Sequence, residues 1–280
     1  MTVRIVTDST CDLPDSTLQK FNITMVPASV VWQGRAYKDR VELSHDQLFA
    51  WLEQGDKVPT TAAPPPAYFS ETFRRLAEET KEIVSLHVTS EHSAVYDVAQ
   101  KGRDAVANGC RIEVIDTRLV SMAMGLVVLD AARTANRGAS MEEVLNAVRN
   151  SVSHVREYAA FDTMRYLTLG GRVNRVVGNL GTTLKIRPIL TITDGRIKLA
   201  GLARTYGQAI ERVKSFVEKV GRVEEWSVVY STDRAEAERL AEYMTRLCPM
   251  GEVPMTRLGP ALGVHGGPGS VVVAVKLKAT

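Results

Sequence analysis

The alternation of strand-like and helix-like segments over the first 155 residues is the strongest constraint on what this chain can fold into. Short apolar runs at residues 3–7, 83–88 and 112–116 are separated by segments with helical spacing of their apolar residues. Strands that alternate with helices favour a parallel sheet, because each helix returns the chain to the starting edge. We therefore predict a three-layer α/β/α arrangement with a mainly parallel sheet and helices on both faces.

Local signals place individual elements within this part. Ser44 and Ser140 are each followed three residues later by Gln or Glu, the capping-box pattern that begins a helix. Apolar residues in 68–77 recur at helical spacing. Residues 25–32 are predicted to form one strand, and the proline-rich segment 58–66 is predicted to be a stiff loop, because proline fixes φ and lacks a backbone donor.

The pattern changes after residue 155. Asp194-Gly195 lies between two strand-like segments, 187–192 and 196–203, which predicts a β-hairpin. Two helical segments and further strands follow, so we expect an α+β domain with a mixed sheet. The predicted domains are residues 1–155, an α/β domain with the proline loop and the Ser93 motif, and residues 156–280, an α+β domain with a Gly-Gly-Arg motif and the His265 loop.

Composition and spacing exclude several classes of function. The net charge is only +3 and Lys and Arg are scattered, which argues against nucleic-acid binding. The three cysteines are far apart and the five histidines lack ligand spacing, so we expect no disulfide framework and no metal site. The N-terminus has no apolar signal region and no apolar stretch reaches the roughly 20 residues of a membrane helix, so a cytoplasmic location is expected.

Three neutral hydrogen-bonding residues stand out as candidate site residues. Thr61 lies in the proline loop, Ser93 precedes a predicted helix, and His265 precedes a glycine-rich turn. Two hydroxyl groups and an imidazole suit a small acidic group at the end of an apolar molecule, because they supply hydrogen bonds without a full counter-charge.

Two other functions remain open from the residues alone. Ser93 and His265, with Asp8 as the third member, could form a hydrolase triad, although no G-x-S-x-G motif is present. The glycine-rich segment 266–269 suggests phosphotransfer, but it lacks the Lys-Ser/Thr of a P-loop.

An ordered set of short motifs resembles the DegV family along the whole chain. The opening Val-Thr-Asp-Ser-Thr-Cys-Asp-Leu-Pro and the closing Gly-Val-His-Gly-Gly-Pro-Gly are the longest of them. The motifs lie at residues 3–14, 114–122, 169–173, 185–190, 194–195, 204–205 and 263–269. Each motif is short, but their shared order and spacing are specific.

The resemblance implies a fatty acid buried between two α/β domains. It also implies that the chain is no enzyme itself but the fatty-acid-binding subunit of a bacterial fatty acid kinase, whose separate ATP-binding subunit forms the acyl phosphate. By the same resemblance, Thr61, Ser93 and His265 bind the carboxylate, whereas Arg172 and Arg204 contact the kinase. The long-chain fatty acid is the ligand, no cofactor is expected, and transient contact with a membrane surface is compatible with this role.

The chain departs from the family pattern beside these residues. Ala62-Ala63 replace Ser-Gln after the threonine, Ala94-Val95 replace Gly-Thr after the serine, and Gly266 replaces threonine after the histidine. The three proposed head-group residues are themselves retained.

Overall fold

Four parallel strands form the first sheet, as the strand–helix alternation predicts. The computed structural model describes residues 2–55, 57–106, 109–172 and 186–278, so the motif residues Val173 and Lys185 lie outside the described residues. The strand order is β2-β1-β6-β7. The bounds are β1 (Arg4–Asp8), β2 (Ile23–Val26), β6 (Glu82–His87) and β7 (Arg111–Asp116).

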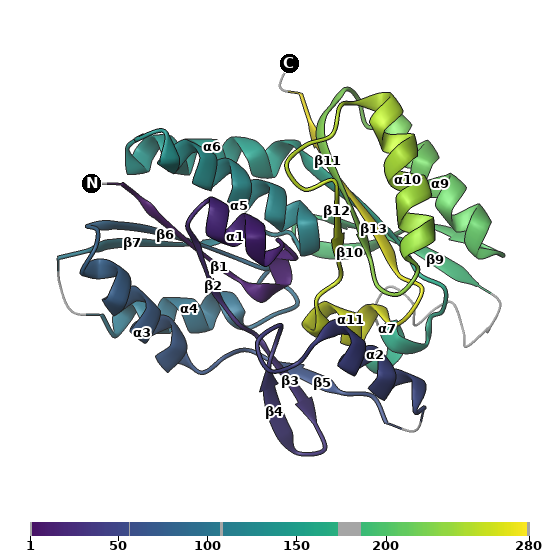
Figure 1. Cartoon of the computed structure of the whole chain (residues 1–280), viewed down its shortest axis with the longest axis horizontal. Helices are drawn as coiled ribbons and strands as arrows, with labels where there is room; N and C mark the ends of the chain where they lie inside the picture. The colour runs from purple at the N-terminus through teal and green to yellow at the C-terminus, as the bar shows by residue number, and fades with distance from the viewer. Residues whose placement is uncertain (1, 56, 107–108, 173–185, 279–280) are drawn as a thin grey trace.

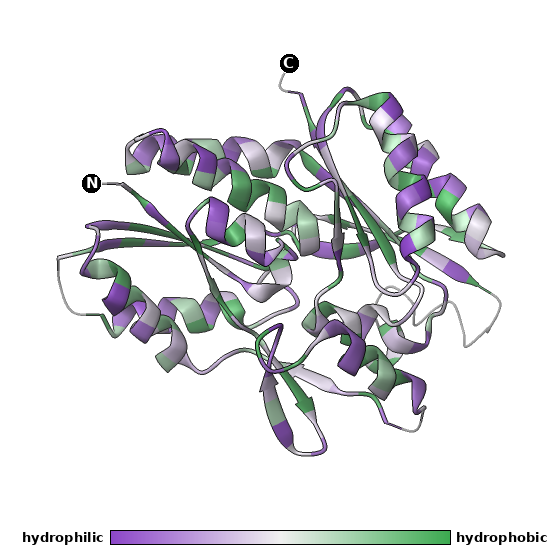
Figure 2. Cartoon of the chain, in the orientation of Figure 1, coloured by the Kyte–Doolittle hydropathy of each residue, from purple (hydrophilic) through white to green (hydrophobic). Residues whose placement is uncertain are grey.

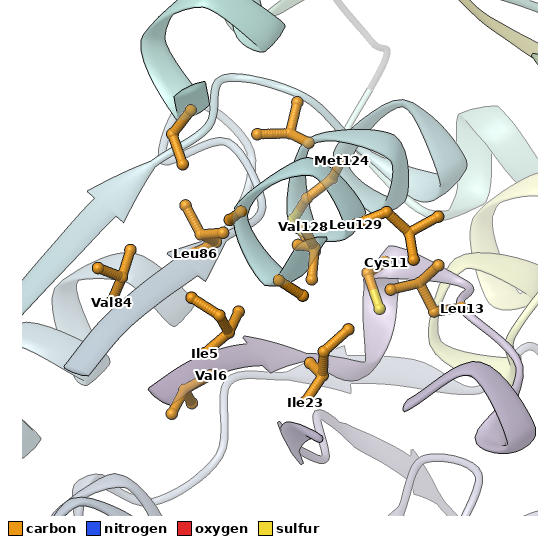
Figure 3. Close-up of a cluster of buried hydrophobic side chains, with 14 of the residues drawn as sticks. Ile5, Val6, Cys11, Leu13, Ile23, Val84, Leu86, Met124, Val128 and Leu129 are labelled. Atoms are coloured by element: carbon orange, nitrogen blue, oxygen red, sulfur yellow. The ribbon is translucent and has the colours of Figure 1, made fainter. Parts of the chain in front are cut away.

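Helices cover both faces of this sheet. One face packs against α3 (Pro66–Ala77) and α4 (Val95–Asp104), and the other packs against α5 (Ser121–Asn136) and α6 (Met141–His154). Short η1 (Ser9–Cys11) and α1 (Asp15–Lys20) follow β1. Figure 3 shows apolar side chains of β1, β6 and α5 gathered in one cluster, among them Ile5, Leu86 and Val128, which are all buried.

The predicted helix starts are confirmed by their capping contacts. Ser44 Oγ accepts a hydrogen bond from the Gln47 N–H at the start of α2 (His45–Glu53). Ser140 and Glu143 form a complete capping box at the start of α6. Each cap satisfies backbone donors that the first helical turn leaves unpaired.

The second sheet is mixed, as expected. Its six strands have the order β10-β9-β8-β13-β11-β12, and only the β11/β12 pair is parallel. The bounds are β8 (Val155–Ala160), β9 (Arg187–Thr193), β10 (Arg196–Ala203), β11 (Val223–Tyr230), β12 (Met255–Arg257) and β13 (Val271–Leu277). Asp194 and Gly195 both have positive φ, which is the backbone geometry of the predicted hairpin turn.

The α5/α6 layer lies between the two sheets. Helix α5 packs against β1 of the first sheet and against β8, β11 and β13 of the second, and nearly all of its residues are buried. The outer face of the second sheet packs against α9 (Tyr206–Lys219) and α10 (Arg234–Leu247) (Figure 1). These outer helices carry many hydrophilic residues, whereas the sheet strands are largely hydrophobic (Figure 2). The predicted fold class is therefore confirmed; the predicted boundary after residue 155 stays a prediction.

A small antiparallel sheet corrects two predictions. It has the order β4-β3-β5, with β3 (Ser29–Trp32), β4 (Arg35–Lys38) and β5 (Thr60–Ala62). The single strand predicted for residues 25–32 is wrong: β2 and β3 are separate strands that belong to different sheets, and proline at position 27 supplies no ladder donor between them. The proline loop is not all loop either, because β5 forms within it.

A third correction concerns the segment around His265. The structure places it in helix α11 (Pro260–Gly266), not in a loop. Proline at the first helical position fits the helix start, where no backbone donor is needed. Helix α11 contacts α2, and it also contacts α7 (Arg165–Leu169), which ends at Gly170. None of the helices within the described residues has the length and apolar character needed to cross a membrane.

Candidate functional site

A mainly apolar cavity of about 400 Å³ is the centre of the candidate site. Its walls come from both halves of the chain: β5 and the start of α4 and α5 on one side, and β8, β9, β13 and α11 on the other. Thr10, in the turn after β1, also lines it, which agrees with the rule that ligands bind beyond the carboxyl ends of parallel strands. The volume lies in the usual range for small-molecule sites.

The structure brings Thr61 and His265 into direct contact across the cavity wall. Thr61 Oγ1 and His265 Nε2 lie 2.9 Å apart, although 204 residues separate them in the chain. Thr61 is held by the pairing of β5 with β3, where it is opposite Val30. His265 is held in the last turn of α11. Both side chains line the cavity, so a ligand oxygen placed there meets a hydroxyl and an imidazole together.

The imidazole of His265 is held in its neutral form. Burial, together with the positive charge of Arg172, lowers its pKa from 6.5 to about 4. Its Nδ1 atom has no hydrogen-bond partner among the described residues. Gly170 packs so closely against this ring that a Cβ at that position would overlap it. A neutral imidazole has one donor and one acceptor nitrogen, so it can bind either a carboxylate or a protonated acid.

Ser93 supplies a second hydroxyl at the N-terminus of α4. Its backbone N–H donates to Thr89 O at 3.2 Å, and its Oγ accepts from the Val95 N–H at 3.3 Å. Ser93, Ala94 and Val95 all line the cavity. The amino end of a helix favours an anionic group, because its backbone N–H groups and dipole are positive there.

The two arginines occupy different positions. Arg172 is exposed and also lines the cavity, and its Nη1 donates to Gly170 O at 2.8 Å. Arg204 is exposed and follows β10; its backbone N–H donates to Gln208 Oε1 at 3.2 Å, and it is not part of the cavity wall. The sequence does not indicate that only Arg172 of the two lines the cavity, because Arg172 and Arg204 both follow turn-like or strand-end segments.

The contacts do not support the hydrolase triad. Asp8 Oδ2 lies 3.0 Å from His87 Nδ1, and His87 Nε2 lies 2.7 Å from Ser85 Oγ. Asp8 is thus bonded within the first sheet and not to His265, whose Nε2 contacts Thr61 instead. The Ser85–His87–Asp8 chain is fully buried and does not line the cavity, so it has a structural role as satisfied core polar groups.

Sequence reasoning missed the buried carboxyl group of the cavity wall. Glu157 on β8 lines the cavity and is buried, although carboxylates are rarely buried without a partner. The sequence does contain one indication of this position: Glu157 alternates with Val155 and Ala159, which places all three on one face of the strand.

The neutral His265 predicts a specific pH dependence of stability. Its pKa falls from 6.5 to about 4 on folding. The unfolded chain therefore binds more protons between these values, and stability is lost as the pH falls from 6.5 towards 4. The contribution is on the order of 3 kcal/mol. Urea unfolding at pH 7 and pH 4.5 should show that the wild type loses more stability than His265→Gln.

The difference in stability loss between the wild type and His265→Gln reports on the His265 side chain. His45, whose pKa burial also lowers to about 4, and Asp12, whose pKa burial raises to about 7, are present in both and cancel in the difference. Equal losses in the two proteins would contradict a buried neutral imidazole at position 265.

Comparison with known proteins places the chain among close structural relatives. The family model described as "Uncharacterised protein, DegV family" matches residues 2–278. A DegV domain-containing protein of Caldanaerobacter subterraneus is 33% identical over 273 residues, which is 95% of each chain. Among solved structures, a DegV family protein from Thermus thermophilus described as fatty acid binding has a TM-score of 0.90 and 29% identity.

A second solved structure extends the same relationship. A Thermotoga maritima protein, described as revealing a fatty acid binding function, has a TM-score of 0.86 and 25% identity and matches over its full length. The Thermus structure covers 99% of this chain and is itself covered completely. Since the family model spans nearly every residue and the relatives match end to end, the chain belongs to the DegV family.

Proposed function

We propose that this protein binds a long-chain fatty acid, with the acyl chain in the cavity and the carboxylate at Thr61, Ser93 and His265. The observation that carries the proposal is the mainly apolar cavity whose wall contains the 2.9 Å Thr61–His265 pair. Two relatives with TM-scores of 0.90 and 0.86 are described as fatty acid binding, which supports the assignment.

The cavity chemistry matches both ends of such a ligand. Each buried methylene contributes about 0.8 kcal/mol, so the acyl chain supplies most of the binding free energy. The carboxylate loses water on entry and needs hydrogen bonds in return. The hydroxyl groups of Thr61 and Ser93, the imidazole of His265 and the amino end of α4 can supply them.

The head-group assignment predicts discrimination between acids and their neutral analogues. We expect about one palmitic or stearic acid per chain, bound at least tenfold more tightly than the matching alcohol or methyl ester, since hydrogen bonds to charged groups contribute about 1.5–3 kcal/mol. Thr61→Val should reduce this acid preference. Titration calorimetry on lipid-free protein measures the ratio of acid affinity to alcohol affinity in the wild type and in Thr61→Val. Equal affinities for acid and alcohol in the wild type would refute the assignment.

We further propose that the bound carboxylate is presented to a separate ATP-dependent kinase subunit, which forms the acyl phosphate. The location of Arg172 at the cavity wall and its exposure support a docking surface there, because a partner could reach both the arginine and the head group. Arg204 is the second proposed contact. Since the proposed partner uses ATP, this role implies a cytoplasmic protein.

The docking proposal predicts different effects for the two arginines. Arg204→Ala should leave fatty acid affinity unchanged and lower acyl phosphate formation in the reconstituted pair. Arg172→Ala should lower acyl phosphate formation too. It should also weaken fatty acid binding a few-fold, because the positive charge of Arg172 reaches the His265 site and attracts the carboxylate proposed to bind there. Raised salt should reproduce the coupling defect, since exposed charge pairs are screened.

An arginine outside the site serves as the control for this experiment. Arg149 on α6 is exposed and bonded to Asn146 of the same helix, so Arg149→Ala should change neither quantity. Unchanged acyl phosphate formation in both Arg172→Ala and Arg204→Ala would exclude them as kinase contacts.

A further inference from the structure

Glu157 places an unpaired carboxyl group in the wall of an otherwise mainly apolar cavity. The residue is 4% exposed and lines the cavity, and its Oε2 atom has no hydrogen-bond partner within the described parts of the chain. An unpaired buried polar atom is costly, so a group of this kind is usually satisfied by something that binds there.

The neighbours of Glu157 do not satisfy it. Ala274 is opposite it on β13, and Ala159 and Val272 are the next residues on the same face. The hydroxyl groups of three other wall residues, Thr10, Ser121 and Thr191, donate their hydrogen bonds elsewhere. Thr10 Oγ1 donates to Asp8 at 2.5 Å, Ser121 Oγ to Asp12 at 2.6 Å, and Thr191 Oγ1 to the backbone oxygen of Glu157 at 2.7 Å.

Burial favours the protonated form of the Glu157 carboxyl group. Burial raises its pKa well above the ordinary value, and the negative charge of Asp12 raises it further. No cation of the described residues forms an ion pair with it. A protonated carboxyl has an O–H donor as well as an acceptor oxygen, so it can exchange two hydrogen bonds with a hydroxyl group.

The position of Glu157 separates it from the proposed carboxylate site. The segment that follows α11 enters the second sheet at Val271, which pairs with Ala160, whereas Glu157 pairs with Ala274. Three residues along a strand span about 10 Å. Glu157 is thus displaced along the strand from the end of β13 that α11 precedes, and in this proposal it faces the body of the acyl chain.

We propose that Glu157 makes the cavity selective for acyl chains that carry a hydroxyl group along the chain. The inference rests on the proposed fatty acid binding and specifies its ligand class. A site with a polar group at a fixed point rejects an analogue that lacks the matching group, because the buried polar atom is then left unpaired. A plain hydrocarbon chain leaves Glu157 Oε2 unpaired, whereas a chain hydroxyl at the right position can bond to it.

The test compares hydroxylated and plain fatty acids of equal length on three proteins. Lipid-free wild type, Glu157→Gln and Glu157→Leu are titrated with stearic acid, 10-hydroxystearic acid and 12-hydroxystearic acid, and with palmitic acid and 16-hydroxypalmitic acid. In the wild type, at least one hydroxy acid should bind about tenfold more tightly than its plain counterpart, the effect of roughly one good hydrogen bond in a buried site.

The two variants identify the cause of that preference. Glu157→Gln keeps a donor and an acceptor and should retain the preference, whereas Glu157→Leu should lose it and bind stearic acid more tightly than the wild type does. A wild type that binds plain acids at least as tightly as every hydroxy acid overturns the inference. The same ratio in the wild type and in Glu157→Leu also overturns it, because the preference then does not come from the carboxyl group.

The experiment also distinguishes this inference from the proposed function. If plain fatty acids bind in about one copy per chain but show no dependence on Glu157, fatty acid binding stands and the hydroxyl selectivity is wrong. If no acid of either series binds the wild type, both are wrong.

Discussion

Replacing Ala159 with tryptophan is expected to lower the affinity for long-chain fatty acids more than a hundredfold. Ala159 lies on the cavity-facing side of β8, between Val272 of β13 and Leu190 of β9, which also line the cavity. An indole at this point would fill much of the roughly 400 Å³ that the acyl chain needs. A hundredfold loss corresponds to about 2.8 kcal/mol, which is the contribution of only about four methylenes.

The same change should not unfold the protein. The indole enters an existing apolar cavity, and filling such a space commonly stabilises a protein. Thermal unfolding of lipid-free Ala159→Trp should therefore occur at or above the wild-type temperature, while calorimetric titration with stearic acid shows little heat. Ala36→Trp, on the exposed face of β4, is the matched control and should bind as the wild type does. Full affinity in Ala159→Trp would place the acyl chain elsewhere.

Gly267→Ala is expected to destabilise the protein by about 4 kcal/mol or more. Gly267 has φ 73° and ψ −178°, a backbone conformation that is essentially restricted to glycine and costs other residues about 1–3 kcal/mol. In addition, a Cβ at this position would overlap the ring of Tyr166, which is buried beneath α11. Overlap in a packed core adds a comparable cost.

Denaturant unfolding of Gly267→Ala and Gly34→Ala separates the two contributions. Gly34 also has positive φ, at 81°, but a Cβ there would meet nothing within 4 Å. Gly34→Ala should therefore show the cost of a positive φ without any side-chain overlap. If the two variants lose equal stability, the Tyr166 ring moves aside freely, and Gly267 does not fix the end of the helix that holds His265.

An element of the fold could be predicted from the sequence where its start or turn depends on contacts within a few residues. The helix caps at Ser44 and Ser140 and the Asp194-Gly195 turn are short-range features; Ser140 has the complete capping box, and Ser44 caps its helix through the Gln47 N–H. The strand within the proline loop was not predicted, because β5 exists only through pairing with β3, about 30 residues earlier. Its three residues carry too little pattern to indicate a strand.

The candidate site shows the same division between local and long-range information. Residue chemistry and the family resemblance single out Thr61, Ser93 and His265, but the contact between Thr61 and His265 depends on the packing of elements 204 residues apart. Arg156 and Glu157 are adjacent charged residues on β8, yet Arg156 is exposed and Glu157 is buried. The covering of one face of that sheet by α5 encloses the Glu157 side chain, and this long-range packing is not indicated by the two adjacent residues.

Helix α5 couples the stability of the two halves of the chain. Its buried residues belong to the first half of the chain, but they pack against strands of both sheets. A fragment that ended at residue 155 would expose the surface of α5 that β8, β11 and β13 cover, and the remaining half would expose one face of its sheet. The hydrophobic cluster around α5 draws residues from both halves, so we expect the cooperativity of unfolding to extend across the predicted boundary. Under the proposed function, release of a fatty acid from between the halves requires local opening near the cavity and not the unfolding of either half.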